Sequence, residues 1–308
     1  MTTLSKTRAA QARKSIAPRL LQSPDLQRIP WLVHGFTTRP GGATTTYGGR
    51  TLNVGFTKDD ERERVERNRK AVLLAAGAAA KGKPWPLVTL RQVHSDLIHV
   101  VRSRKLGSPK QGPLKKSPYV GDGLVTDLRG ITLGVLTADC FPILLVDAKK
   151  KAVGAFHAGW RGTVKRIVEK GVGIMRLEFG SRPEDIHAAI GPGIQSCSFE
   201  VGEEVKAAFQ TQFAYADELF HDVQESDAVR ERYPMLFMNQ RAPGHGDPCI
   251  KLHLDLREAN RRQLISAGVP EANITAMPDC TACSTRKFFS HRAESGKTGR
   301  QMALIGIQ

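Results

Sequence analysis

The sequence predicts a single α+β domain over residues 26–308. Short strand-like runs and amphipathic helices follow one another without the strict βαβ alternation of a parallel sheet. No internal repeat and no strong linker divides the chain, and its 308 residues, 40% of them apolar, can bury a substantial core. No run approaches the roughly 18 to 20 consecutive apolar residues of a membrane helix, so we expect a soluble protein.

The N-terminal part is predicted to contain a tail, glycine-rich turns and one helix. Residues 1–24 carry five basic side chains and no acid, and we expect a disordered tail over residues 1–25. A turn follows at Arg39-Pro-Gly-Gly42. Thr57, with Asp60 three residues later, resembles a helix N-cap, and the helix should run through Leu73 and stop near Gly77.

The rest of the chain is predicted to alternate strands with three helices. A basic, proline-bearing stretch at 103–118 has no periodicity and is predicted to be a loop insertion. A helix is expected where Val164, Val168, Val172 and Met175 share one face, and further helices near 202–213 and 254–267. Strands are expected at 87–90, 97–101, 131–136, 143–147, 152–156, 186–190, 288–290 and 302–307.

The charge and the cysteines limit the functional classes. The formal net charge is +16, but the tail and the 102–116 stretch together carry eleven basic residues and no acid, which leaves +5 for the rest. A nucleic-acid-binding protein is therefore an alternative, and not the favoured one. Five cysteines make an odd number and no apolar signal core is present, so we expect reduced thiols and a cytoplasmic location. Cys280-Thr-Ala-Cys283 is a solitary pair, expected to be a turn with two thiols, with a metal or redox site as the alternative. Neither Cys197 nor Cys249 has an evident partner.

Three segments place candidate metal ligands beside turns. Cys140 follows the strand at 131–136, His157 follows the strand at 152–156, and His94 lies between two further strands. Neighbouring strands that end at one edge would bring the three side chains together. Two imidazoles and one thiolate with an open fourth position are typical of catalytic zinc, which lowers the pKa of a bound water to about 7. Two alternatives stay open: ordinary strand-end residues with a buried cysteine, or a nucleophilic Cys140 with a histidine base.

Arginines form a second group of candidates. A planar guanidinium suits phosphate and carboxylate groups, although a surface role is the simpler interpretation for any single arginine. No phosphate-loop or dinucleotide fingerprint accompanies them. The candidates are Arg39, Arg69, Arg161, Arg292 and Arg300.

Taken in series, these segments resemble the YfiH family, also called the laccase-domain, polyphenol oxidase or purine nucleoside phosphorylase family. The resemblance covers residue 26 to the C-terminus. It rests on the motifs Gly35-Phe-Thr-Thr-Arg39, Leu52-Asn-Val-Gly55, Asn68-Arg69, Gln92-Val-His94, Gly121-Asp-Gly-Leu-Val-Thr-Asp127, Ala138-Asp-Cys140, His157-Ala-Gly-Trp-Arg161, Gly191-Pro-Gly193 and Thr298-Gly-Arg300.

The resemblance implies a single domain with four αββα-type layers and mixed sheets. It implies zinc, with copper possible, on His94, Cys140 and His157. It also implies phosphorolysis of adenosine, inosine, guanosine and methylthioadenosine, with adenosine deamination. Arg69 matches the position associated with phosphate, and Arg39, Asn53 and Arg161 are further expected substrate contacts. Copper-dependent phenol oxidation and hydrolytic editing of a peptidoglycan precursor are the alternative activities.

Asp139 and Cys140 are the expected catalytic residues. Deamination requires a carboxylate to move a proton, by analogy with other zinc deaminases, and Asp139 lies next to Cys140. Its alternative role is to orient a loop. The partners are then purine nucleosides and phosphate, and the oligomeric state is not predicted.

Overall fold

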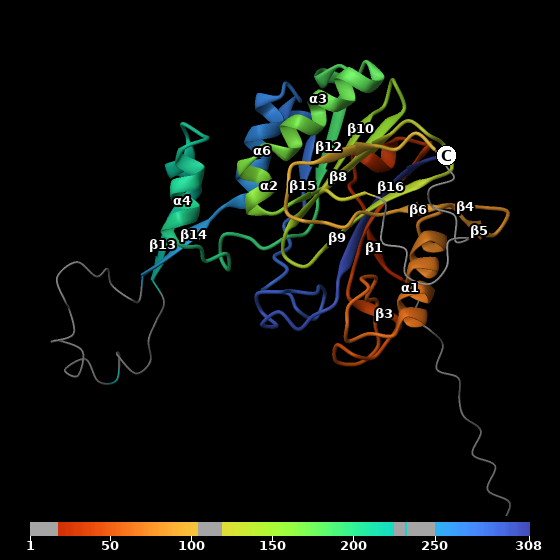
Figure 1. Ribbon diagram of the computed structural model, residues 1–308, viewed down its shortest axis with the longest axis horizontal. Helices are drawn as coiled ribbons and strands as arrows, with labels where there is room; N and C mark the ends of the chain where they lie inside the picture. The colour runs from red at the N-terminus through yellow and green to blue at the C-terminus, as the bar shows by residue number, and fades with distance from the viewer. Residues whose placement is uncertain (1–17, 104–118, 225–231, 233–249) are drawn as a thin grey trace, which may run out of the picture.

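Two β-sheets pack face to face at the centre of the protein (Figure 1). The computed structural model describes residues 18–103, 119–224, 232 and 250–308. The five-stranded sheet has the order β1 (Leu20–Leu21), β2 (Leu32–Thr37), β16 (Gln301–Ile307), β9 (Thr132–Thr137) and β6 (Leu87–Val88). The six-stranded sheet has the order β15 (Ile274–Ala276), β12 (Ile186–Ile190), β10 (Phe141–Asp147), β11 (Ala152–Ala158), β8 (Gly123–Thr126) and β7 (Ile98–Val100). Most pairs are antiparallel, and β6–β9, β7–β8 and β12–β15 are parallel.

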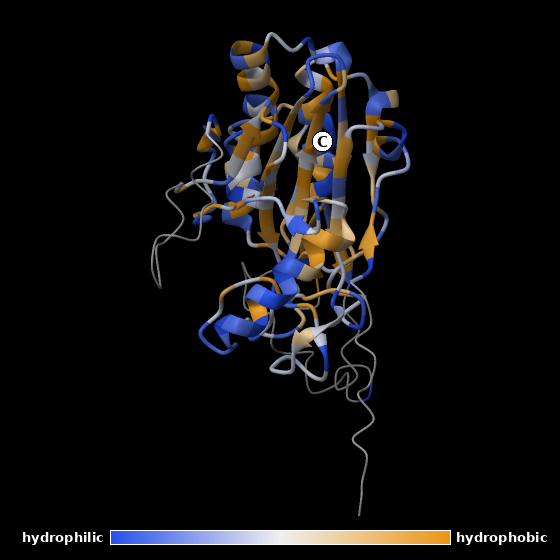
Figure 2. Ribbon diagram, turned by 90° about the vertical axis from the view of Figure 1, so that its right-hand side faces the viewer, coloured by the Kyte–Doolittle hydropathy of each residue, from blue (hydrophilic) through white to orange (hydrophobic). Residues whose placement is uncertain are grey.

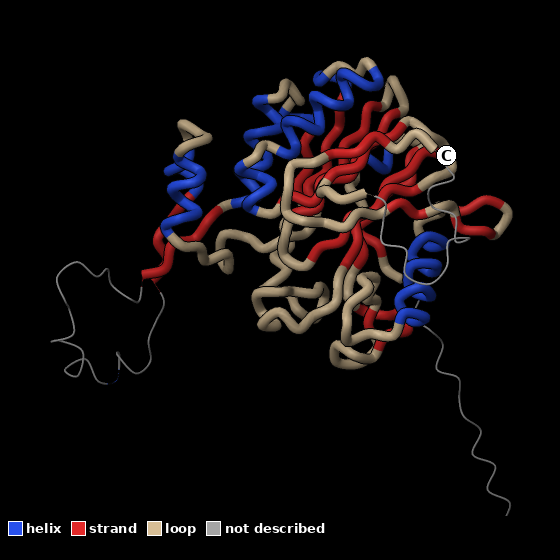
Figure 3. Tube along the Cα trace, viewed as in Figure 1, coloured by secondary structure: helices blue, strands red, loops and turns tan. Residues whose placement is uncertain are grey.

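Helices cover the two outer faces (Figure 3). Helix α1 (Arg62–Ala75) lies on the side of the five-stranded sheet, against β3 (Pro40–Thr44). Helices α2 (Trp160–Val164), α3 (Ile167–Phe179) and α6 (Leu256–Ser266) lie on the side of the six-stranded sheet. Helix α4 (Glu203–Gln210) lies beside the hairpin of β13 (Phe220–Gln224) and β14 (Ile250–Leu254), and β4 (Ala79–Ala80) pairs with β5 (Lys83–Pro84).

The central strands are buried on both faces, which explains their continuous apolar runs. On β16, Met302 and Leu304 belong to the core under α1, whereas Ala303 and Ile305 belong to the core between the sheets. Side chains alternate between the two faces of β10 in the same way: Leu144 faces the other sheet, whereas Ile143 and Leu145 belong to the core under α3. Figure 2 shows hydrophobic residues concentrated along these strands. Three apolar layers thus separate helix, sheet, sheet and helix, which confirms the predicted αββα arrangement.

Several predicted boundaries are wrong. Residues 20–21 pair with β2, so part of the predicted tail belongs to a sheet. The helix at α1 begins at Arg62 with Glu61 as its N-cap, and Thr57 instead bonds the Tyr47 hydroxyl at 2.5 Å. The predicted helix around 164–175 is split into α2 and α3, because Arg166 adopts a left-handed conformation with φ of 62°. Residues 288–290 form no strand.

Two basic segments of the prediction fall largely outside the described residues. These are residues 1–17 of the tail and residues 104–118 of the loop insertion. Within the described part, no helix is both long enough and apolar enough to cross a membrane.

The chain crosses between the two sheets at one end of this sandwich. Residues 138–140 connect β9 in one sheet to β10 in the other, and residues 89–97 connect β6 to β7 in the same way. Strand β11 ends beside the start of β10, because the two are antiparallel and Pro142 pairs with His157. Backbone leaving regular pairing at these crossings is free to direct side chains into a common space.

Candidate metal centre and pocket

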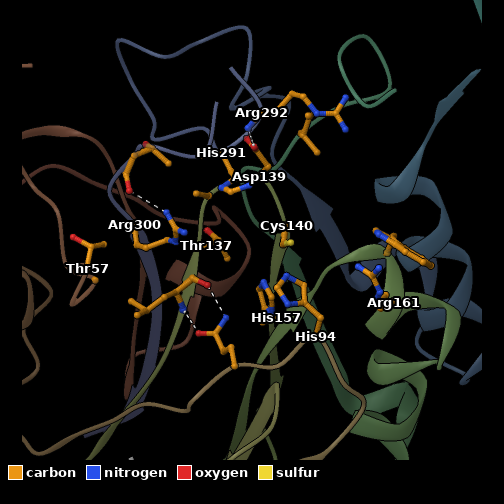
Figure 4. A pocket seen from close by; sticks show the side chains of 18 of the residues that line it. Thr57, His94, Thr137, Asp139, Cys140, His157, Arg161, His291, Arg292 and Arg300 are labelled. Atoms are coloured by element: carbon orange, nitrogen blue, oxygen red, sulfur yellow. Dashed lines mark hydrogen bonds between the residues drawn. The ribbon is translucent and has the colours of Figure 1, made fainter. Parts of the chain in front are cut away.

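His94, Cys140 and His157 meet where these crossings converge. Their ligand atoms all lie within 4.8 Å of one another. The two imidazole rings are 4.9 Å apart between centroids and inclined by 73°. Figure 4 shows the three side chains pointing toward one another. The predicted meeting of the three side chains is therefore observed. Cys140 lies just before the start of β10, whereas His157 lies near the end of the antiparallel strand β11.

Asp122 holds two of these three residues in position. Its carboxylate accepts hydrogen bonds from the backbone N–H groups of Val93, His94 and Ser95, at 3.2, 3.1 and 2.6 Å. It also accepts from the Ser95 hydroxyl at 2.7 Å and lies 2.8 Å from Nδ1 of His157. These bonds stabilise His94 in a left-handed conformation with φ of 56°, which costs about 1–2 kcal/mol for a residue with a Cβ.

The contact with Asp122 also sets the tautomer of His157. With Nδ1–H donated to the carboxylate, Nε2 is left as the atom that faces Cys140. An imidazole that binds a metal usually donates its other ring N–H in this way, which fixes the ring and raises its basicity. Asp122 belongs to the Gly121–Asp127 motif, for which the sequence predicts no role at the metal centre. Its position between two glycines, at the start of β8, is the signal that could have identified it.

Cys140 and His157 strongly shift each other's pKa. Burial raises the pKa of the Cys140 thiol, but the charge and hydrogen bonds of His157 and His94 outweigh it and lower the pKa to about 6. Burial lowers the pKa of His157, but Cys140 and Asp122 outweigh it and raise the pKa to about 9. The thiolate is the form of cysteine that both binds metals and attacks carbon.

A cavity of about 660 Å³ opens above the triad, a size typical of small-molecule sites. Its lining combines aromatic and aliphatic side chains with several cations. The apolar members are Phe56, Leu90, Leu136, Trp160, Ile194, Phe199 and Leu256. The charged or titratable members besides the triad are Lys58, Asp59, Asp139, Arg161, His291, Arg292 and Arg300.

Comparison with known proteins gives the family. Residues 33–308 match the family described as multi-copper polyphenol oxidoreductase laccase. The chain belongs to this family. It is 37% identical over 294 residues to a purine nucleoside phosphorylase of Deinococcus radiodurans, covering 94% of this chain and 92% of the relative. It is 39% identical over 221 residues to adenosine deaminase RL5 from an unknown prokaryotic organism, covering 71% of this chain and 74% of the relative.

A solved structure supports the same assignment. The Bacillus licheniformis hypothetical protein YfiH superposes with a TM-score of 0.77 at 31% identity, covering 95% of this chain and 97% of that one. The resemblance to the YfiH family is thereby confirmed, as is the mixed single-domain fold. The protein is an enzyme of this laccase-domain family.

The donor set at the triad is compatible with a metal ion. One thiolate and two imidazoles are ligands that zinc and copper both accept. The surrounding backbone leaves room for them only because residue 159 is glycine. A Cβ there would lie 2.9 Å from Sγ of Cys140 and 3.1 Å from Cδ2 of His94.

Asp139 lines the pocket, and both oxygens of its carboxylate already accept a hydrogen bond. One oxygen accepts from the Thr281 hydroxyl and the other from the backbone N–H of Arg292, both at 2.7 Å. Its backbone has φ of 93°, and its carbonyl accepts from the N–H of Ile194. These contacts correspond to the alternative role, in which Asp139 orients loops, and they disfavour the predicted proton transfer.

Three of the four predicted substrate-binding residues do not line the cavity. Arg69 donates to the carbonyl of Val54 at 2.8 Å and stacks on Phe56, 4.2 Å from the ring centroid. Burial lowers the pKa of Arg69 to about 10. Arg39 is paired with Glu294 at 2.8 Å and donates to two backbone carbonyls. Both side chains hold neighbouring loops and neither lines the cavity, so their assignment to phosphate stays a prediction.

Asn53 is the third of these residues, and it supports the pocket from behind. Its Oδ1 accepts from the backbone N–H groups of Gly55 and Arg300, and its Nδ2 donates to Asp60. It is fully buried, so it has no surface with which to touch a substrate.

Arg161 is the predicted substrate residue that does line the cavity. Its guanidinium lies 4.2 Å from the Trp160 ring centroid, and within the described part of the chain it forms no hydrogen bond or ion pair. Figure 4 shows Arg161 on one side of the triad and Thr57 with Arg300 on the other. Arg292 and Arg300, which the sequence offered only as members of the arginine group, also reach the lining.

Proposed function

We propose that this protein is a zinc-dependent purine nucleoside phosphorylase that also deaminates adenosine. The observation that carries the proposal is one cavity that combines a Cys–His–His donor set, aromatic walls and guanidinium groups. The aromatic walls would bind a purine ring, the guanidinium groups would bind phosphate, and the donor set would hold a metal ion next to the reacting bond. The names of the relatives, a purine nucleoside phosphorylase and an adenosine deaminase, support both activities.

His94, Cys140 and His157 would hold the zinc ion. When bound, zinc would supply a Lewis acid that polarises a substrate oxygen or lowers the pKa of water at the base of the cavity. Asp122 serves this site by keeping Nδ1 of His157 protonated, so that Nε2 keeps its lone pair for the metal.

The aromatic side chains would bind the base. Trp160 and Phe199 line the cavity and present flat apolar surface, on which a purine stacks with about 1–3 kcal/mol per base. Trp160 also orients Arg161, whose guanidinium lies against its ring. A base held there leaves the ribose free to extend toward the cationic groups.

Arg161 is the residue we assign to phosphate. Its guanidinium has no hydrogen-bond or ion-pair partner within the described residues, whereas Arg300 donates to the carbonyls of Thr298 and Gly299 and Arg292 to that of Glu200. Phosphate bound there would attack C1′ of the ribose as the bond from C1′ to the base breaks. The departing base takes the bonding electrons and must gain a proton. His291, which also lines the cavity, can supply it, since a ring N–H of an imidazole can donate a proton as a general acid.

The test is to compare the two reactions in one variant. Arg161→Ala should raise the KM for phosphate in phosphorolysis at least tenfold and change adenosine deamination less than threefold, because deamination uses no phosphate. Arg176→Ala, an exposed arginine on α3 outside the cavity, is the matched control and should change neither reaction. Equal losses of both reactions in Arg161→Ala would contradict the assignment to phosphate.

Copper-dependent phenol oxidation fits the donor groups less well. Reduction of oxygen by a multi-copper enzyme requires several copper ions with many histidine ligands. The chain has nine histidines, and within its described residues only one potential metal-binding group contains any. Copper would nevertheless bind this Cys–His–His set more tightly than zinc, so metal content has to be measured in protein expressed without added copper.

A second candidate mechanism uses no metal. Cys140, His157 and Asp122 form a chain from thiol to imidazole to carboxylate, the arrangement of a nucleophilic cysteine. In that mechanism His94 has no evident function, although its strained conformation is maintained by Asp122. Activity that survives removal of metal by a chelator would favour this candidate.

A further inference from the structure

Three cysteines form a separate cluster of thiols outside the triad. The sulfur atoms of Cys197, Cys280 and Cys283 all lie within 4.8 Å of one another, and those of Cys197 and Cys283 are 3.5 Å apart. Cys280 is buried and the other two are exposed. The prediction that Cys197 lacks a partner is therefore wrong, because the fold brings it to a pair 86 residues further along the chain. Neither proposed reaction uses these thiols.

The hydroxyl of Ser198 lies among the three sulfur atoms. Its Oγ is 3.1 Å from Sγ of Cys283, 3.5 Å from Sγ of Cys197 and 3.7 Å from Sγ of Cys280. Three sulfur atoms and one oxygen thus form one compact group. Two of the four residues are adjacent in sequence, and the other two belong to one turn.

One Sγ–Sγ distance and the three Sγ–Oγ distances are close to those of a tetrahedral metal site. With metal–sulfur bonds of about 2.3 Å and tetrahedral angles, sulfur atoms lie about 3.8 Å apart, and with a metal–oxygen bond of about 2.0 Å a sulfur lies about 3.5 Å from the oxygen. The measured Sγ–Sγ distance of 3.5 Å and the three Sγ–Oγ distances agree to within a few tenths of an ångström. A disulfide would need sulfur atoms about 2.0 Å apart and would use only two of the three thiols.

We propose that Cys197, Cys280 and Cys283 bind a second zinc ion, with the Ser198 hydroxyl or a water in its place as the fourth ligand. Three thiolates select a thiophilic ion, and a tetrahedral set filled by the protein is typical of structural zinc. This site is independent of the nature of the reaction in the cavity.

The second site would brace one wall of that cavity. The backbone N–H of Gln195 contacts Sγ of Cys280 at 3.4 Å, and Thr281 N–H donates to the carbonyl of Gly193. The Thr281 hydroxyl in turn holds Asp139, the residue before Cys140. A metal joining Cys197 to the 280–283 turn would therefore fix the two segments that position Ile194 and Asp139 in the lining.

Metal stoichiometry tests the proposal. Protein saturated with zinc and then freed of excess by gel filtration should hold two zinc ions per chain, measured by mass spectrometry of the metal. Cys140→Ala should retain one, and Cys197→Ala/Cys283→Ala should also retain one, with both lost when the three changes are combined. Because Cys197 and Cys283 are exposed, their replacement should preserve the fold, which circular dichroism checks. One zinc in the unmodified protein, retained by Cys197→Ala/Cys283→Ala, would overturn the second site and leave the first intact.

Thiol reactivity gives a second readout on the unmodified chain. With zinc bound, Cys197 and Cys283 should resist alkylation by iodoacetamide despite their exposure, and a chelator should make them reactive. Alkylation at the same rate with and without zinc would refute the site. A native mass lower by two hydrogens and restored only by a reductant would identify a disulfide and would equally refute it.

Discussion

Replacing Asp122 by asparagine keeps the shape of the side chain and removes its charge. All five groups around the carboxylate are donors: three backbone N–H groups, the Ser95 hydroxyl and the ring of His157. Asparagine has one acceptor oxygen, so its amide nitrogen must face some of these donors. The orientation with fewer opposed donors puts the amide nitrogen in the place of Oδ1, against His94 N–H and His157. The amide oxygen then takes the place of Oδ2 and accepts from Val93 and Ser95.

That orientation changes the tautomer of His157. Nδ1 would accept from the amide, so Nε2 would carry the hydrogen and point it toward Cys140, where a metal needs a lone pair. We expect zinc affinity to fall about 10- to 100-fold, the usual effect of losing such a partner. One unsatisfied backbone donor and weaker neutral hydrogen bonds should lower the free energy of unfolding by about 2–4 kcal/mol.

Two measurements with one control check this prediction. Zinc affinity is measured by competition with a chelator, and the free energy of unfolding by urea titration of the metal-free protein. Ser95→Ala removes one donor and keeps the charge, so it should cost about 1 kcal/mol and leave zinc affinity within a few-fold. The reasoning is refuted if Asp122→Asn binds zinc like the unmodified protein, or loses no more stability than Ser95→Ala.

Two further changes test the packing and the pH dependence. Gly159→Ala places a methyl group 2.9 Å from Sγ of Cys140, so zinc affinity should fall at least tenfold. Gly173→Ala on α3 is the control, because its methyl group meets nothing within 4 Å and should leave zinc affinity unchanged. Equal zinc affinities of the two variants would contradict the requirement for glycine at residue 159. Burial lowers the pKa of His34 to about 4. Between pH 6.5 and about 4 the unfolded chain binds a proton that the native state does not, so stability falls with falling pH, by about 3 kcal/mol in total. His34→Gln, which keeps an acceptor but cannot titrate, should remove this part of the slope in urea titrations at pH 7 and pH 4.5, and parallel losses in both proteins would disprove it.

The triad could be predicted from sequence because each member lies beside a recognisable apolar strand. The run Phe141–Asp147 is buried on both faces and hence apolar throughout, so Cys140 stands out at its edge. His157 occupies the matching end of β11. The order of the strands in two sheets was not readable from such runs, since it depends on which strands pair across the sandwich.

The residues that support the triad and the cavity could not be identified from sequence, because their contacts also depend on how the strands pair. Asp122 lies 28 residues from His94 and 35 from His157; the pairing of β8 with β11 brings it to His157, and the pairing of β7 with β8 brings it to His94. Arg39 and Arg69 matched the chemistry of phosphate binding, but Glu294 and two carbonyls engage the guanidinium of Arg39, and Nε of Arg69 donates to the carbonyl of Val54. Residue type thus identified arginines capable of binding phosphate, whereas their availability depended on tertiary contacts.

The most direct test of the central claim is product analysis with metal-defined protein. Zinc-loaded protein is incubated with adenosine, inosine and methylthioadenosine, with and without phosphate, beside Cys140→Ala and chelator-treated protein. We predict release of free base and ribose 1-phosphate only when phosphate and zinc are both present, inosine formation from adenosine independent of phosphate, and neither reaction in Cys140→Ala. No turnover by the zinc-loaded protein, or full turnover after the metal has been removed, would contradict the account.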